Sequence, residues 1–138
     1  MTTSNPAEAS VRSIHVSAAV IVNDADELLL VRKAGTTAFM QPGGKPEPGE
    51  SAAETLSREL LEELGIRVEP DALEALGTFT AAAANEPGFL VVADVFVADI
   101  GAQQPVVAAE IEELRWVGST EAADLDIAPL ARENFLPA

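Results

Sequence analysis

Three glutamates, Glu59, Glu62 and Glu63, lie three and four residues apart in the segment RELLEE, residues 58–63. At about 100° of rotation per residue, an α-helix carries these side chains on one side. Like charges crowded together repel, and a hard divalent cation such as Mg²⁺ removes that cost because it prefers oxygen ligands and bridges phosphates. Taken alone, such a triplet is more often an ordinary solvated helix face, so its surroundings must decide.

The loop before this segment has two features that favour a metal site. Gly43 and Gly44 permit a close approach between the backbone and a ligand or metal ion. Arg58 can pair with Glu54, one helical turn before it, or with Glu50, and either pair would tie the loop region to the helix. The sequence therefore predicts a loop and a helix that together surround a cation.

Positive charge is scarce in this chain, which has 8 Lys and Arg residues against 23 Asp and Glu and a formal net charge of −15. Such a balance argues against nonspecific binding to nucleic acid or to an anionic membrane surface. It still permits binding of a phosphorylated small molecule when divalent cations lie between the two. Arg32, Lys33 and Lys45 are candidates for contact with a polyphosphate, the alternative being ordinary surface solubility.

Length and composition predict one compact domain, because the chain has 138 residues, of which 48% are hydrophobic. The lack of cysteine excludes disulfides, thiolate metal sites and thiol nucleophiles, and it suits a reducing compartment. No apolar run approaches the roughly 20 residues of a membrane span. Residues 1–13 also lack the layout of a signal peptide. We therefore expect a cytoplasmic protein.

The element that must carry the glutamates is a helix over residues 51–64. Ser51 is the expected N-cap, Glu54 is placed to close a capping box, and Gly65 stands at the C-terminal stop position. A leucine at every fourth residue supplies the stripe that faces the core. Its members are Leu56, Leu60 and Leu64.

The remaining sequence alternates strand and helix patterns, which predicts an α/β domain with one central sheet system. We expect this domain to span residues 14–138, after a flexible N-terminal arm over residues 1–13. Residues 14–22 and 27–33 are expected to form a β-hairpin around a turn at 23–26. The long loop 34–48 is of a length that is usually functional. Further strands are expected at 75–80, 89–98 and 112–117, and short helices at 119–124 and 129–135.

The segment 44–66 resembles the Nudix box, the signature of the Nudix hydrolase family, to which MutT-type enzymes belong. The pattern is Gly, five residues, Glu, seven residues, Arg-Glu, an aliphatic residue, any residue, Glu-Glu, any residue, Gly and an aliphatic residue. Every defined position is filled without departure, which makes the signal specific. The matching residues are Gly44, Glu50, Arg58, Glu59, Leu60, Glu62, Glu63, Gly65 and Ile66.

This resemblance implies a fold, a reaction and a set of ligands. The fold would be an α/β/α sandwich with a mixed central sheet. The reaction would be Mg²⁺-dependent attack of water on a phosphorus of a nucleoside diphosphate linked to another group, such as a nucleoside triphosphate or a nucleotide sugar. Mn²⁺ is the expected substitute for Mg²⁺. The implied ligands are the carboxylates of Glu59, Glu62 and Glu63 and the carbonyl oxygen of Gly44.

Other roles follow from the same resemblance. Glu50 would pair with Arg58, and Gly65 would end the helix, as structural residues. Arg58, Glu59 and Glu62 are the expected catalytic residues, with Glu59 as the favoured general base. The family is not uniform on this last point.

A late acidic residue is a second candidate for the metal site and for the base. Glu110 lies six residues before Trp116, as does a late metal-binding glutamate of MutT-type members. The alternative is a solvated charge near an edge strand.

Arg32 and Lys45 are expected to contact substrate phosphates, and Phe39 is the candidate for stacking on a base, although core packing is the more common role of such a ring.

Two other classes of function remain open. A Nudix-like regulatory module would bind a nucleotide without turnover, and an acidic scaffold would bind no metal at all. The complete box favours the enzyme. The expected partner is a small-molecule nucleotide, with no nucleic acid and no membrane; a homodimer is common among similar proteins. The asparagine that reads a guanine-like base in MutT-type enzymes has no clear counterpart near residues 126–130, which weakens an oxidised-dGTP assignment.

Overall fold

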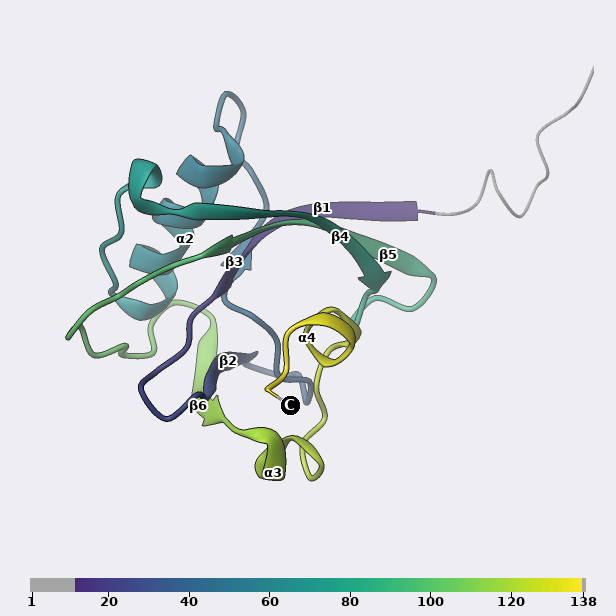
Figure 1. The fold of residues 1–138 in the computed structure, drawn as a ribbon. Helices are drawn as coiled ribbons and strands as arrows, with labels where there is room; N and C mark the ends of the chain where they lie inside the picture. The colour runs from purple at the N-terminus through teal and green to yellow at the C-terminus, as the bar shows by residue number, and fades with distance from the viewer. Residues whose placement is uncertain (1–11, 138) are drawn as a thin grey trace, which may run out of the picture.

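The computed structural model describes residues 12–137, which are built around a mixed four-stranded sheet (Figure 1). The strand order is β3-β1-β5-β4, with β1 parallel to β5 and both outer strands antiparallel to their neighbours. The strands are β1 (Arg12–Val20), β3 (Gly43–Gly44), β4 (Glu74–Ala82) and β5 (Phe89–Val97). The mixed sheet of the predicted α/β fold is confirmed.

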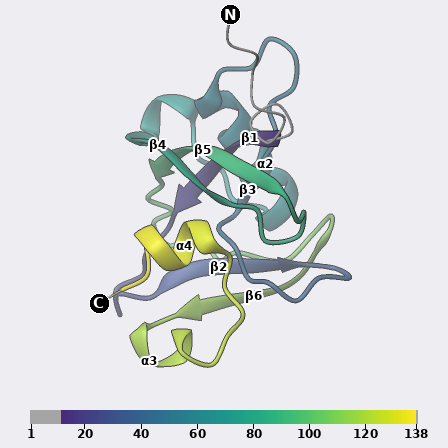
Figure 2. The same cartoon turned by 90° about the vertical axis from the view of Figure 1, so that its right-hand side faces the viewer.

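Helices cover both faces of this sheet. Successive residues of a strand point to opposite faces. Ala19 of β1 packs with the leucine stripe of α2 (Ala52–Leu64), and Ala18 packs with Leu130 of α4 (Pro129–Asn134). Figure 2 shows α4 between the mixed sheet and the pair of strands β2 (Leu28–Lys33) and β6 (Ile111–Val117). The predicted α/β/α sandwich is therefore confirmed.

The predicted hairpin of residues 14–22 and 27–33 is wrong beyond its turn. β2 pairs with β6 in a separate two-stranded antiparallel sheet, and it meets the chain that leaves β1 only at the bridge between Val22 and Leu28. Both edges of β1 are already occupied, by β3 and β5. In addition, Leu28 and Leu29 pack into two different core clusters. Because each face of β2 packs in a different cluster, β2 lies between these clusters and not beside β1 in the mixed sheet.

The helix that carries the glutamates has the ends that were predicted. The Ser51 hydroxyl accepts the Glu54 N–H at 3.1 Å, and the Glu54 carboxylate accepts the Ser51 N–H at 2.8 Å. Gly65 adopts a left-handed conformation at φ 66° and donates its N–H to the carbonyls of the last turn. These caps hold α2 in place from both ends, so the positions of its carboxylates are set by local sequence.

The remaining elements lie close to their predicted positions. The strands predicted at 75–80, 89–98 and 112–117 are present as β4, β5 and β6. Their ends differ from the predicted ends by at most two residues. A one-turn helix, η1 (Pro70–Ala72), precedes β4, and α3 (Ser119–Ala122) and α4 account for the two short C-terminal helices. β1 starts at Arg12, so Arg12 and Ser13 belong to a strand and not to the predicted arm; residues 1–11 lie outside the described part. None of the helices within residues 12–137 has the length and apolar character of a membrane crossing.

Candidate active site

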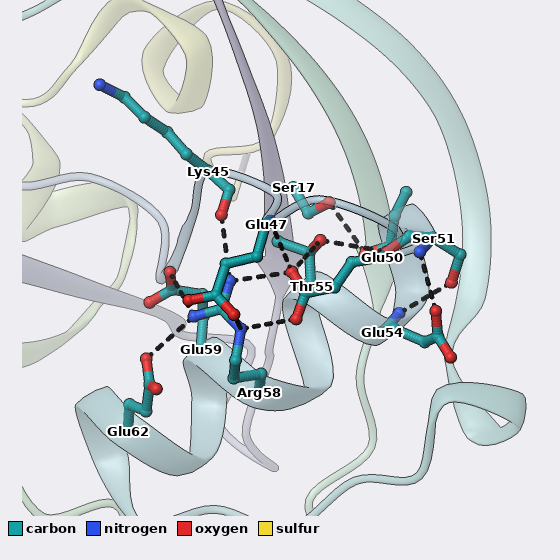
Figure 3. Close-up of polar contacts among 11 residues, drawn as sticks. Ser17, Lys45, Glu47, Glu50, Ser51, Glu54, Thr55, Arg58, Glu59 and Glu62 are labelled. Carbon is teal, nitrogen blue, oxygen red and sulfur yellow. Dashed lines mark hydrogen bonds and ion pairs between the residues drawn. The ribbon is translucent and has the colours of Figure 1, made fainter.

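Arg58 is the centre of a polar network that joins the loop before α2 to the helix itself (Figure 3). Its Nε donates to Glu50 Oε2 at 2.7 Å, and its Nη2 donates to Glu50 Oε1 at 3.0 Å. The same Nη2 also donates to the Lys45 carbonyl at 3.1 Å. Nη1 reaches the other way, to Glu62 at 3.0 Å and to Glu59 at 3.3 Å. One guanidinium therefore holds both the loop and two of the three clustered carboxylates.

Glu50, and not Glu54, is the partner of Arg58. Glu54 is engaged in the capping box, whereas Glu50 also accepts the Glu47 N–H at 2.8 Å and the Thr55 hydroxyl at 3.0 Å. The ion pair with Arg58, followed by the Glu47 N–H, lowers the pKa of Glu50 to about 2. The same pair raises the pKa of Arg58 further above its ordinary value. Glu50 is thus fully ionised at neutral pH and fixes the loop.

Replacing Glu50 with Gln is expected to lower the melting temperature at neutral pH, with an effect that fades in acid. Since the pKa of Glu50 falls from 4.5 to about 2 on folding, its ionised form stabilises the protein above pH 4.5. That contribution is lost as the pH falls from 4.5 through about 2. Thermal unfolding of wild type and Glu50→Gln at pH 7 and at pH 3 measures this.

Glu47→Gln is the matched control for this loop. The Glu47 side chain is 64% exposed and its carboxylate lies 3.6 Å from Arg58 Nε, so its removal should leave the melting temperature nearly unchanged at both pH values. If the melting temperature of Glu50→Gln kept the full pH dependence of wild type, the Glu50–Arg58 pair would not be the stabilising contact that we describe.

The three clustered glutamates differ in their exposure. Glu63 is only 6% exposed, whereas the side chains of Glu59 and Glu62 are 16% and 52% exposed. Burial raises the pKa of Glu63 to about 7, although its carboxylate accepts the Gly43 N–H at 3.2 Å. Burial also raises the pKa of Glu59. The structure therefore holds two acids at the core margin under conditions that disfavour their charge, which is the cost that a bound cation removes.

Gly44 lies directly against the Glu59 carboxylate. A Cβ at this position would come within 2.2 Å of Glu59 Oε2, so only a glycine leaves room for the carboxylate beside the loop backbone. The donors gathered here are all oxygens, which suits Mg²⁺ or Mn²⁺. Within residues 12–137, however, no three acidic or histidine side chains surround a common point at metal-binding distance. Arg58 holds Glu59 and Glu62 apart from Glu63, which instead binds the Gly43 N–H.

Glu110 lies beside the clustered glutamates because its loop docks on the end of α2. The Ala108 N–H donates to the Glu63 carbonyl at 2.9 Å, and the Glu110 carbonyl accepts the Ala34 N–H at 2.9 Å. The charge of Glu110 contributes to the raised pKa of Glu63. The structure thus brings the late glutamate to the same place as the Nudix-like helix.

A cavity of about 510 Å³ contains these groups. α2, the β4–β5 loop and the loop before β6 supply its glutamates, β3 supplies glycine backbone, and Lys33 and Lys45 are its basic residues. β1, β5, α4 and the residues around Met40 supply an apolar part. A cavity of this size holds a small organic ligand, and its two kinds of lining suit a ligand with one charged and one apolar end. The apolar lining includes Ile14, Val16, Met40, Val91, Leu130 and Ala131.

A protein-family model described as the NUDIX domain matches residues 13–138 of this chain. The chain belongs to the Nudix family. A protein of Bacillus subtilis (strain 168) named "Putative 8-oxo-dGTP diphosphatase" is 33% identical over 100 residues, which are 71% of this chain and 62% of that protein. The match thus spans less than two thirds of the length of this relative.

Solved structures agree with this assignment. The MutT protein from Methanosarcina mazei Go1 has a TM-score of 0.67 and 26% identity, over 90% of this chain and 96% of that one. The ORF135 protein of E. coli has a TM-score of 0.65 and 29% identity, over 88% of this chain and 85% of that one. The match of the family model, over residues 13–138, includes all of residues 14–138, for which the sequence predicted a single domain.

The structure does not bring Arg32 or Phe39 to the cavity of this Nudix domain. Arg32 pairs with Glu112 at 3.0 Å and with Glu113 at 3.2 Å, and it is absent from the cavity lining. Phe39 is buried in the core, and the Arg115 guanidinium lies 5.6 Å from the centre of its ring. Neither side chain is therefore placed to contact a substrate, whereas Lys45 does line the cavity.

Lys33 takes the place predicted for Arg32. Along β2, Leu29 and Val31 pack toward α2, and Lys33 continues this alternate row to the edge of the glutamate cluster. Its charge acts on the pKa values of both Glu59 and Glu63. The alternation along the strand places Lys33 and Arg32 in different rows, but only the packing of Leu29 and Val31 against α2 shows which row faces the glutamates. Sequence analysis also missed Gln41, a buried residue in the cavity lining.

Proposed function

We propose that this Nudix protein hydrolyses a phosphoanhydride bond in a nucleoside diphosphate linked to another group, with Mg²⁺ as its cofactor. The observation that carries the proposal is one cavity of about 510 Å³ that combines five glutamates, the Gly44 backbone and two lysines with an apolar part. Such a cavity can hold the phosphates of a nucleotide at one end and its base at the other. A phosphorylated ligand in so acidic a site requires a cation between the charges.

The residues that would hold the cation are those of the Nudix box. Carboxylate oxygens of Glu59, Glu62 and Glu63 and the carbonyl oxygen of Gly44 are hard donors, and Glu110 is a further one. Bound there, Mg²⁺ or Mn²⁺ would neutralise charge on the phosphates and lower the pKa of a water molecule. The close approach of the Gly44 backbone to the Glu59 carboxylate, which a Cβ at position 44 would prevent, supports this assignment.

The protein side chains would divide the remaining work. Lys33 and Lys45 contact the phosphate oxygens, and Arg58 keeps Glu59 and Glu62 in place. Glu59 accepts a proton from the attacking water as the water oxygen bonds to phosphorus. The bridging P–O bond then breaks, and its electron pair leaves with the departing phosphate group. Glu110 is the alternative proton acceptor.

Nucleoside triphosphates and nucleotide sugars are the substrate classes that we propose. The Bacillus subtilis relative, whose name refers to 8-oxo-dGTP, supports the triphosphates. The absence of a suitable asparagine near residues 126–130 argues against reading a guanine-like base as MutT-type enzymes do. A nucleotide-sensing module without turnover is the second candidate, and the complete Nudix box makes it the weaker one. A cysteine-free chain suits the cytoplasm, where these small molecules occur.

A substrate panel with and without metal tests the proposal. Nucleoside triphosphates, 8-oxo-dGTP, nucleotide sugars and dinucleotides are incubated with the protein in Mg²⁺, Mn²⁺ or chelator, and the products are separated. We expect hydrolysis only with metal, and a raised melting temperature on metal addition. Glu62→Gln should reduce hydrolysis by at least about 100-fold and remain folded. Tight nucleotide binding without turnover across the panel would establish the sensing module instead, and an unchanged melting temperature would favour an acidic scaffold.

A further inference from the structure

The carboxamide of Gln41 makes a hydrogen bond through its nitrogen but not through its oxygen. The residue is 7% exposed, and its Nε2 donates to the Ala19 carbonyl at 3.0 Å. The reason for this bond lies in the next residue. The Ala19 N–H donates to the Pro42 carbonyl at 2.9 Å, but Pro42 has no N–H to return to the Ala19 carbonyl, as an antiparallel pair otherwise would. The side chain of Gln41 supplies the missing donor.

The other end of this amide has no partner. Among the buried side-chain nitrogen and oxygen atoms of residues 12–137, Gln41 Oε1 is the one without a hydrogen bond. Gln103 shows the usual arrangement, because its Nε2 donates to the Arg67 carbonyl and its Oε1 accepts the Arg67 N–H. A buried acceptor without a partner loses its hydrogen bonds to water and gains none in the protein, which costs free energy of folding. An unpaired buried oxygen in a native fold therefore requires an explanation.

The position of Gln41 indicates where a donor can come from. Gln41 lines the cavity together with Met40, and α4 contributes Ala128 and Leu130 to the same lining. Met40, Ala128 and Leu130 are apolar and offer no donor. The polar residues of the lining, such as Ser17 and Asn85, make no hydrogen bond to Gln41 Oε1. Because Gln41 borders the cavity, a donor bound inside it is the group that can reach Oε1 while Nε2 keeps its bond to the Ala19 carbonyl.

We propose that Gln41 Oε1 accepts a hydrogen bond from an amino group of the substrate's base, so that the cavity selects nucleotides whose base carries one. This inference rests on the proposed nucleotide substrate. Phosphates have only acceptor oxygens at neutral pH, so they cannot pair with Oε1. The basic residues of the cavity, Lys33 and Lys45, are the candidates for the phosphates. The base is the part of a nucleotide that combines an apolar face with N–H donors.

Binding of matched nucleotide pairs tests this selection without relying on turnover. Non-hydrolysable α,β-methylene analogues are titrated calorimetrically into the full chain with Mg²⁺. One pair is GTP and ITP, which differ by the 2-amino group; another is ATP and purine riboside triphosphate, which differ by the 6-amino group. We expect the amino-bearing member of at least one pair to bind about three- to tenfold more tightly. A 2′-deoxy form of each is measured alongside.

Two variants separate the role of the amide from that of folding. Gln41→Met keeps the approximate volume and should abolish the preference, whereas Gln103→Met alters an amide outside the cavity and should keep it. Thermal melting reports whether each variant folds. If Gln41→Met does not fold, the affinities of the wild-type protein for the matched nucleotides decide whether the cavity prefers an amino-bearing base. Equal affinity within every wild-type pair, or an unchanged preference in folded Gln41→Met, overturns the inference. So does a preference that follows the 2′-hydroxyl in place of the base. Failure of every nucleotide to bind would refute the proposed function as well.

Discussion

Replacing Glu59 with Gln is expected to reduce hydrolysis by about 10²–10⁴-fold while the protein stays folded. The Glu59 carboxylate lies against the Gly44 backbone, lines the cavity and accepts a hydrogen bond from Arg58 at 3.3 Å. Gln has nearly the same shape but neither takes up a proton nor bears the charge that a cation requires. Both the proton transfer and the metal site would therefore suffer, and steady-state turnover of the best substrate in the panel measures the loss.

Glu69→Gln is the matched control, because Glu69 is exposed and lies outside the cavity. It should change turnover by less than the error of the assay. If Glu59→Gln kept turnover within a few-fold of wild type, Glu59 would not be the proton acceptor. The same substitution at Glu110, which also lines the cavity, would then be expected to give the large loss.

Replacing Gly43 with Ala is expected to destabilise the fold by roughly 3 kcal/mol or more, and so to lower the melting temperature by roughly 10 °C. A Cβ on Gly43 would lie 1.9 Å from the Ser17 carbonyl oxygen, which is backbone and has little room to move. Gly43 also has φ 152°, a conformation that side chains rarely adopt. The β3–β1 pairing must therefore open, and with it the link from Gly43 N–H to Glu63. Thermal and denaturant unfolding measure the loss.

Gly49→Ala is the comparison that isolates the steric overlap. Gly49 has φ 83°, but a Cβ there would meet nothing within 4 Å. Only the backbone strain remains, so we expect a loss of about 1 kcal/mol. Equal destabilisation by the two substitutions would show that backbone conformation, and not the contact with Ser17, explains the need for glycine at position 43.

The sequence by itself determined the helix and the identity of its chemical groups. The signals that define α2 are local: the capping box of Ser51 and Glu54, the leucine stripe and Gly65 all act within a few residues of one another. The spacing of Glu59, Glu62 and Glu63 follows from helix geometry alone. Because the Nudix box is one contiguous segment, its internal contacts, including the pair of Glu50 with Arg58, could be predicted without knowing the rest of the fold.

Only the tertiary structure decided which distant residues reach that helix. The 14–22/27–33 hairpin failed because the edges of β1 are taken by β3 and β5, and strand partners far apart in sequence leave no local trace. Whether Arg32 or Lys33 faces the glutamates depends on which face of β2 packs on α2. The unpaired oxygen of Gln41 arises from the Pro42 position beside Ala19 and from the burial around it. Burial and cross-strand contacts are properties of the assembled fold, so the sequence pattern around these residues could not reveal them.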